Sequence, residues 1–221
     1  MEEEKPFDFM DCVNILKSTG KWVSGLRDLR TVIAEISDES LFHHTCQYFM
    51  GIHILEYSND FAQWVGESLE ERGLSERLST IDPFELKDAD SLRMELTSVI
   101  DKHLELFPTL RDALPGDEFY FSETITIVFH TGIQARNLAE FLTAIRYIDP
   151  GSIYYHFYEA RIRHGTDDFS TWFEDALKKK ALAETIRAID PFMHTTEGIR
   201  QHIIETVEKQ LEEEMEGVVI S

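Results

Sequence analysis

Apolar residues recur at helical spacing over most of the chain. The stretches 26–36 and 138–145 place leucine, isoleucine and phenylalanine residues three or four positions apart, which puts them on one face of a helix. Two further amphipathic runs, at 88–106 and 196–215, each follow a break that contains proline, and proline ends a helix at the preceding residue. This pattern predicts an all-α fold.

One pattern is ambiguous, at residues 9–17 and 121–129. In the second stretch, apolar residues at 125, 127 and 129 alternate with others, as in a strand. Residues 9, 12, 13 and 16 of the first stretch nevertheless share one helical face, and the second stretch repeats that spacing. We favour helix for both stretches. If they are strands instead, the two copies could pair antiparallel across a pseudo-twofold axis.

The two halves of the chain resemble each other. The phrase Asp-Pro-Phe occurs at 82–84 and again at 190–192, an offset of 108 positions that also aligns Trp64 with Trp172. Upstream, an offset of 112 aligns the first stretch of the chain with the stretch that begins at 119. Similarity at a fixed offset indicates a tandem duplication. We predict a first helical repeat at 1–106, a linker at 107–118 and a second helical repeat with an acidic C-terminal helix end at 119–221, packed about a pseudo-twofold axis.

Several short motifs occur along the chain, and some of them occur in both halves. They are the sequence SIYYH, the sequence IDPF in each half, an aspartate-phenylalanine pair followed by tryptophan in each half, and a threonine-glycine pair before the sequence NLAEFL. Together they resemble the family catalogued as domain of unknown function 5752, over nearly the whole chain. The resemblance implies a compact duplicated domain, and it implies no catalytic residue because the family has no assigned chemistry.

The charge of the chain limits its partners. The formal net charge is −21, with 42 acidic and 21 basic residues, which repels nucleic-acid phosphates and anionic lipid headgroups. No apolar run is long enough for a membrane span, and the acidic start, MEEEKPFDF, is unlike a secretory signal. We therefore expect no nucleic-acid partner, no membrane partner and a cytoplasmic protein. Cys12 and Cys46 lack partner spacing and are predicted to be free.

Only two histidines, His44 and His156, occupy equivalent positions in both halves. The simpler interpretation is a half-buried imidazole that packs against apolar neighbours. The alternative is that the two repeats bring both histidines, with Asp60 and Asp168, to a shared cleft that binds a metal or a small acid. The local spacing does not supply the three or four converging ligands of a metal site, so no metal is assigned.

Two threonine-glycine pairs, Thr19-Gly20 and Thr131-Gly132, come before predicted helices. The free amides at a helix start attract anions, and Arg136 would add a positive charge in the second half. Thr131 and Arg136 are therefore candidate anion ligands. A capping threonine and a turn glycine explain the same pattern without a ligand.

No nucleophile, base or cofactor motif stands out, so we expect a non-catalytic binding or regulatory module. Its ligand, a protein partner or a small molecule, would occupy the groove between the repeats or an aromatic face. That face would consist of Phe42, Tyr154, Tyr155 and Tyr158. The alternative is a metal- or anion-dependent enzyme with a site at the repeat interface. The sequence assigns no cofactor and no oligomeric state.

Overall fold

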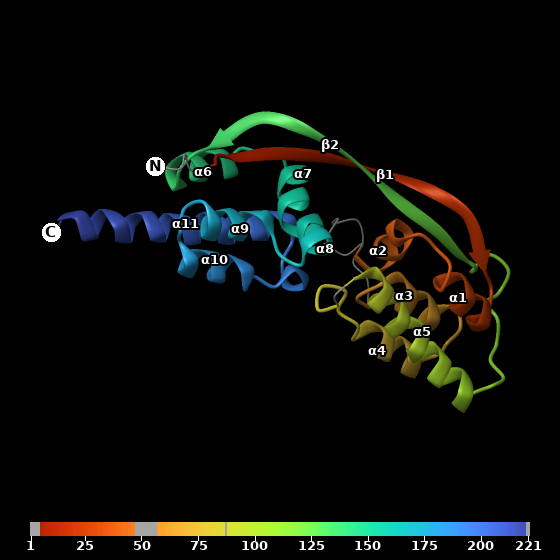
Figure 1. Ribbon diagram of the computed structural model, residues 1–221. Helices are drawn as coiled ribbons and strands as arrows, with labels where there is room; N and C mark the ends of the chain where they lie inside the picture. The colour runs from red at the N-terminus through yellow and green to blue at the C-terminus, as the bar shows by residue number, and fades with distance from the viewer. Residues whose placement is uncertain (1–4, 47–56, 87, 220–221) are drawn as a thin grey trace. The chain divides into compact units, whose positions relative to one another are not determined.

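The protein combines helices with one long pair of strands. The computed structural model describes residues 5–46, 57–86 and 88–219. Strands β1 (Phe7–Val23) and β2 (Phe119–Ala135) form a two-stranded antiparallel sheet (Figure 1). The fold is therefore mixed, and the prediction of an all-α protein is wrong.

The error lies in the two ambiguous stretches, 9–17 and 121–129, which are strands and not helices. In the first stretch the predicted helical face is only half buried: Val13 is 53% exposed and Leu16 is 64% exposed, although Phe9 and Cys12 on the same face are 1% and 7% exposed. Burial instead alternates at the start of each strand, which is the period of an extended chain. The alternative, antiparallel pairing of two strands, is confirmed.

Helices occupy the chain after each strand. After β1 come α1 (Leu26–Ile33), α2 (Asp38–Cys46), α3 (Asp60–Glu67), α4 (Arg72–Ser79) and α5 (Ala89–Leu106). After β2 come α6 (Leu138–Ile145), α7 (Pro150–Ile153), the π-helix η2 (Tyr154–Glu159), α8 (Ala160–His164), α9 (Asp168–Asp175), α10 (Lys180–Arg187), the 3-10 helix η3 (Pro191–Met193) and α11 (Thr196–Val219). The predicted helices at 88–106 and 196–215 are confirmed by α5 and α11. In the described ranges no helix is long and apolar enough to cross a membrane.

The helices belong to two compact units. Unit 1 comprises residues 1–13 and 127–221, and unit 2 comprises residues 14–126. The start of β1 therefore belongs to the unit that holds helices α6–α11, and the start of β2 belongs to the unit that holds α1–α5 (Figure 1). Each unit is completed by the start of a strand whose remainder belongs to the other unit.

Each unit has its own core, into which the start of one strand inserts two phenylalanines, Phe7 and Phe9 in unit 1 and Phe119 and Phe121 in unit 2. In unit 1, the ring centroid of Phe9 lies 5.5 Å from that of Phe141, and both side chains are buried. In unit 2, the ring centroid of Phe121 lies 6.3 Å from that of Phe61, and these are also buried. Burial of one such side chain stabilises the fold by roughly 1.5–3 kcal/mol, so the strand starts are an integral part of both cores.

Candidate functional site

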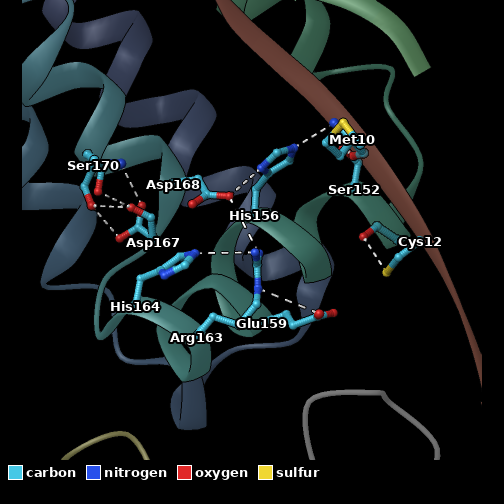
Figure 2. Close-up of polar contacts among 12 residues, drawn as sticks. Met10, Cys12, Ser152, His156, Glu159, Arg163, His164, Asp167, Asp168 and Ser170 are labelled. Carbon is cyan, nitrogen blue, oxygen red and sulfur yellow. Dashed lines mark hydrogen bonds and ion pairs between the residues drawn. The ribbon is translucent and has the colours of Figure 1, made fainter. Parts of the chain in front are cut away.

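Each of the two equivalent histidines links an aspartate to the exchanged strand. In unit 1, His156 Nδ1 lies 2.8 Å from Asp168 Oδ2, and His156 Nε2 accepts a hydrogen bond of 2.8 Å from the backbone N–H of Met10 in β1 (Figure 2). Unit 2 repeats this arrangement: His44 Nδ1 lies 2.8 Å from Asp60 Oδ2, and its Nε2 accepts a bond of 3.0 Å from the N–H of Ser122 in β2. The four predicted residues thus form two histidine–aspartate pairs, one in each unit.

The hydrogen bonds define the tautomer of both rings. A backbone N–H can only donate, so Nε2 of His156 accepts with its lone pair and a neutral ring carries its proton on Nδ1, where it donates to Asp168. The same reasoning applies to His44 and Asp60. Both imidazoles are buried, at 3% exposure each. Neither ring therefore has a nitrogen lone pair available for a metal or a substrate.

Other bonds fix the same strand positions. The hydroxyl of Ser152 donates to the carbonyl of Met10 at 2.5 Å, so both backbone polar groups of Met10 are bound by unit 1 helices (Figure 2). In unit 2, the hydroxyl of Ser40 donates to the carbonyl of Ser122 at 2.7 Å. The histidine pairs are thus part of a set of bonds that fastens the start of each strand to its unit.

One group of possible metal ligands in unit 2 lies close together, His43, His44 and Asp60, with ligand atoms within 4.8 Å of one another. Burial and the neighbouring His44 lower the pKa of His43 to about 4, so this ring is neutral near pH 7. His44, however, uses Nε2 to accept from Ser122 and Nδ1 to donate to Asp60. A metal would have to break that arrangement, so the group does not fit a preformed site.

The predicted threonine-glycine pairs do not precede helices. Thr19-Gly20 lies inside β1 and Thr131-Gly132 inside β2, so the proposed helix-start anion site is absent at these positions. The glycines adopt φ values of 75° and 78°, and a left-handed glycine within a strand is typical of a β-bulge. The hydroxyl of Thr131 donates to the carbonyl of Phe9 at 2.5 Å, and Arg136 is an exposed residue just beyond β2. Thr131 therefore takes part in strand pairing, and Arg136 lies at the surface.

The predicted aromatic face is divided between the two units. Phe42 is in unit 2, whereas the three tyrosines are in unit 1. Tyr158 is 1% exposed, and its hydroxyl donates to the carbonyl of His194 at 3.2 Å. Tyr154 and Tyr155 are half-buried, and the guanidinium of Arg163 lies 4.5 Å from the ring centroid of Tyr155. Tyr158 is thus a core residue and not part of a docking face.

A cleft opens beside the His156–Asp168 pair. It has a volume of about 740 Å³ and lies between the start of β1 and helix α9, entirely within unit 1. Its buried lining includes Phe7, His156 and Trp172. The indole N–H of Trp172 donates to the carbonyl of Lys5 at 2.9 Å and so holds the beginning of the described chain against α9.

Charged side chains surround this aromatic lining. Lys5, Lys178, Asp8 and Asp175 line the cleft and are exposed. Asp8 accepts a hydrogen bond of 2.5 Å from the side-chain amide of Gln134. The cleft therefore combines apolar surface with charges of both signs, as small-molecule sites do.

Sequence reasoning found His156 and Asp168 but missed the other residues of the cleft. Trp172 resembles a core position in the sequence, and the start of β1 could not be placed beside α9 without the strand exchange. A signal was present: at the offsets of 112 and 108, Lys5 aligns with Asp117 and Lys178 with Glu70, so both lysines replace acids. Because the matched positions carry opposite charges in the two halves, the fold does not require a lysine at either of them.

The two cysteines are buried and free, as predicted. The thiol of Cys12 lies 3.4 Å from the carbonyl oxygen of Gly151 and donates to it, and burial raises the pKa of this thiol to about 12. Burial also raises the pKa of Cys46 to about 12. Neither thiol is therefore ionised near neutral pH. Because the thiolate is the reactive form of cysteine, neither residue is expected to be reactive.

Comparison with known proteins supports the resemblance seen in the sequence. The model of the family described as "Family of unknown function (DUF5752)" matches residues 4–208. The solved structure of OrfY from Thermoproteus tenax is 30% identical in sequence, with a TM-score of 0.78 over 95% of this chain and 97% of that one. None of the curated proteins compared with the chain matches it.

Proposed function

Because the chain belongs to the DUF5752 family, which is described as being of unknown function, we propose a function from its geometry: a non-catalytic binding module that holds a small molecule in the cleft of unit 1. The observation that carries this proposal is the cleft beside Trp172 and the His156–Asp168 pair. Its volume of about 740 Å³ falls within the range of roughly 300–1,000 Å³ that is usual for small-molecule sites.

The composition of the cleft supports ligand binding. Phe7 and Trp172 supply apolar surface, and their ring centroids are 5.5 Å apart, so they form one continuous aromatic lining. The bonds from Met10 to His156 and from Trp172 to Lys5 hold the strand side of the cleft in place. A preorganised wall reduces the entropy lost on binding.

The same bonds argue against catalysis. General acid–base chemistry needs a group that can exchange a proton with the substrate, but both nitrogens of His156 are engaged, by Met10 and Asp168. The hydroxyl of Thr171, which also lines the cleft, donates to the carbonyl of Asp167 at 2.9 Å. His156 and Thr171 are therefore not free to exchange a proton with a ligand, which favours a cleft that holds a molecule over one that transforms it.

The test uses the chain's tryptophans as reporters. It contains three, Trp22, Trp64 and Trp172, so its ¹⁵N-labelled form gives three indole N–H resonances. Trp172 lines the cleft, whereas Trp64 makes the equivalent bond in unit 2, to the carbonyl of Asp117 at 2.6 Å. Compounds from a fragment set of mixed charge should shift the Trp172 resonance and leave Trp64 in place.

A matched pair of variants tests the location. Ala176 lines the cleft at the end of α9, and Ser68 occupies the same position at the end of α3 in unit 2. Ala176→Phe should fill the cleft and abolish the fragment-induced shifts, whereas Ser68→Phe should preserve them. If no fragment shifts Trp172, or if the shifts persist in folded Ala176→Phe, this cleft is not the binding site.

A further inference from the structure

From the charged residues around the cleft we infer the class of its ligand, an inference that rests on the proposed function: the cleft binds a small organic anion. Lys5 and Lys178 hold the negative group, and the uncharged body of the ligand packs against Phe7 and Trp172. A carboxylate and a phosphate ester share this chemistry.

The two lysines have unused charges. Within the described part of the chain, neither Lys5 nor Lys178 makes an ion pair, although the protein has two acidic residues for each basic one. By contrast, Lys179, the neighbour of Lys178, pairs with Glu214 at 2.5 Å. Two lysines without ion-pair partners among the described residues line one cleft, where their ammonium groups can bind an anion through charge-assisted hydrogen bonds.

The fold does not explain why these positions are lysines. Lys178 has a φ of 57°, and Glu70, its match in unit 2, has a φ of 60°, so the same left-handed turn forms with either charge. Lys5 and Asp117 are matched as well, because the carbonyl of each accepts the indole N–H of a tryptophan. The backbone is common to both units, and only unit 1 places two positive charges there.

Two of the three carboxylates that line the cleft are less available than the lysines. Asp8 already accepts from Gln134, and Asp168 from His156. Asp175 has no ion pair or hydrogen bond among the described residues, so its charge opposes an anion and would favour a cation. This residue consequently discriminates between the two ligand classes.

The experiment compares three compounds with one ring and different charges. Benzoate, benzamide and benzamidine are titrated into the protein at low ionic strength, and the indole resonances of Trp172 and Trp64 are followed. Benzoate should shift Trp172 with the lowest dissociation constant, Trp64 should stay unchanged, and inorganic phosphate should compete with benzoate. Added salt should weaken the binding because it screens exposed charges.

Variants identify the residues that hold the anion. Lys5→Glu and Lys178→Glu, which introduce the charge found in unit 2, should each raise the dissociation constant for benzoate by about tenfold. Lys21→Glu is the control, since Lys21 is an exposed residue of unit 2 and gives the same change in net charge. Asp175→Asn should lower the dissociation constant for benzoate.

Other outcomes overturn the inference in distinguishable ways. If benzamidine shifts the Trp172 resonance more than benzoate does, and Asp175→Asn weakens the binding of benzamidine, the ligand is a cation and the cleft remains a binding site. If benzamide binds as well as benzoate, or Lys21→Glu acts like Lys178→Glu, the lysines do not hold the ligand. If neither these compounds nor the fragment set shifts Trp172, the proposed function itself fails.

Discussion

The two units of this protein fasten a strand in the same way but present different surfaces beside it. His156 and His44 make equivalent bonds to an aspartate and to a strand N–H, and both strands insert phenylalanines into a core. The residues next to these pairs differ, because Lys5 and Lys178 in unit 1 correspond to Asp117 and Glu70 in unit 2. Features shared by the units thus identify what stabilises the strand, and features that differ identify where to look for a ligand.

This comparison gives the histidine–aspartate pair a structural role. Because the pair occurs in both units, and only the unit 1 pair has the two lysines beside it, the pair itself does not define the site. A buried imidazole with both nitrogens bonded satisfies a strand N–H and a carboxylate at once. We therefore expect changes at the histidines to affect stability first, and changes at the lysines to affect binding first.

The largest expected effect comes from removing a histidine. His156→Ala leaves the N–H of Met10 without a partner, leaves the carboxylate of Asp168 with only its 4.0 Å ion pair to Arg163, and creates a cavity, so the free energy of unfolding should fall by about 3 kcal/mol. Hydrogen exchange should accelerate in α6–α11 and at the start of β1. His44→Ala should instead accelerate exchange in α1–α5 and at the start of β2.

Urea denaturation combined with hydrogen-exchange mass spectrometry measures both effects. His156→Gln serves as the milder control, since its side-chain carbonyl can still accept a hydrogen bond. If His156→Ala loosened α1–α5 more than α6–α11, the assignment of the β1 start to unit 1 would be incorrect.

The sequence predicted much of the helical structure but not the strands or their exchange. Capping residues such as Asn59 and Asp167 act locally, and each accepts an N-cap hydrogen bond, from the backbone N–H of Ala62 and Ser170 respectively. The strand segment at Phe9 is different, because its conformation depends on a partner strand and on helices more than a hundred residues away. Local periodicity cannot report such contacts.

The candidate site shows the same limit. Equivalence between the halves identified His156 and Asp168 and left two interpretations open, a packed imidazole and a shared site. The same bonds in both units assign these residues to the shared fold. The lysines that distinguish unit 1 were visible only as differences between matched positions. Their proximity to Trp172 follows from the exchange of β1, which the sequence did not show.

A smaller effect should appear in the dependence of stability on pH. His43 has a pKa near 4 in the folded protein, below its ordinary value of 6.5, because burial favours the neutral ring. As the pH falls below about 6.5, the unfolded chain binds the proton first, so stability is lost down to about pH 4, by at most about 3 kcal/mol in total. His43→Tyr, which introduces the residue found at the matched position 155 of unit 1, should remove this loss.

Urea denaturation at pH 7 and pH 4.5 tests this prediction through the difference between the wild type and His43→Tyr. Carboxylates titrate in both proteins, so their contribution cancels in that difference. Equal losses of stability in the two proteins would contradict a neutral, buried His43.

The smallest expected effect concerns the matched left-handed residues Glu70 and Lys178. Both have a φ near 60°, which costs energy for a residue with a Cβ, so glycine at either position should raise the free energy of unfolding by up to about 1 kcal/mol. The ion pair of Glu70 with Arg111 is exposed, and its loss should subtract little. Lys178→Gly should in addition weaken benzoate binding, whereas Glu70→Gly should leave it unchanged. If both glycine variants gain the same stability but only Lys178→Gly weakens benzoate binding, the backbone conformation determines the turn and the lysine side chain determines binding. If both variants lose stability, the side chains and not the backbone stabilise these turns.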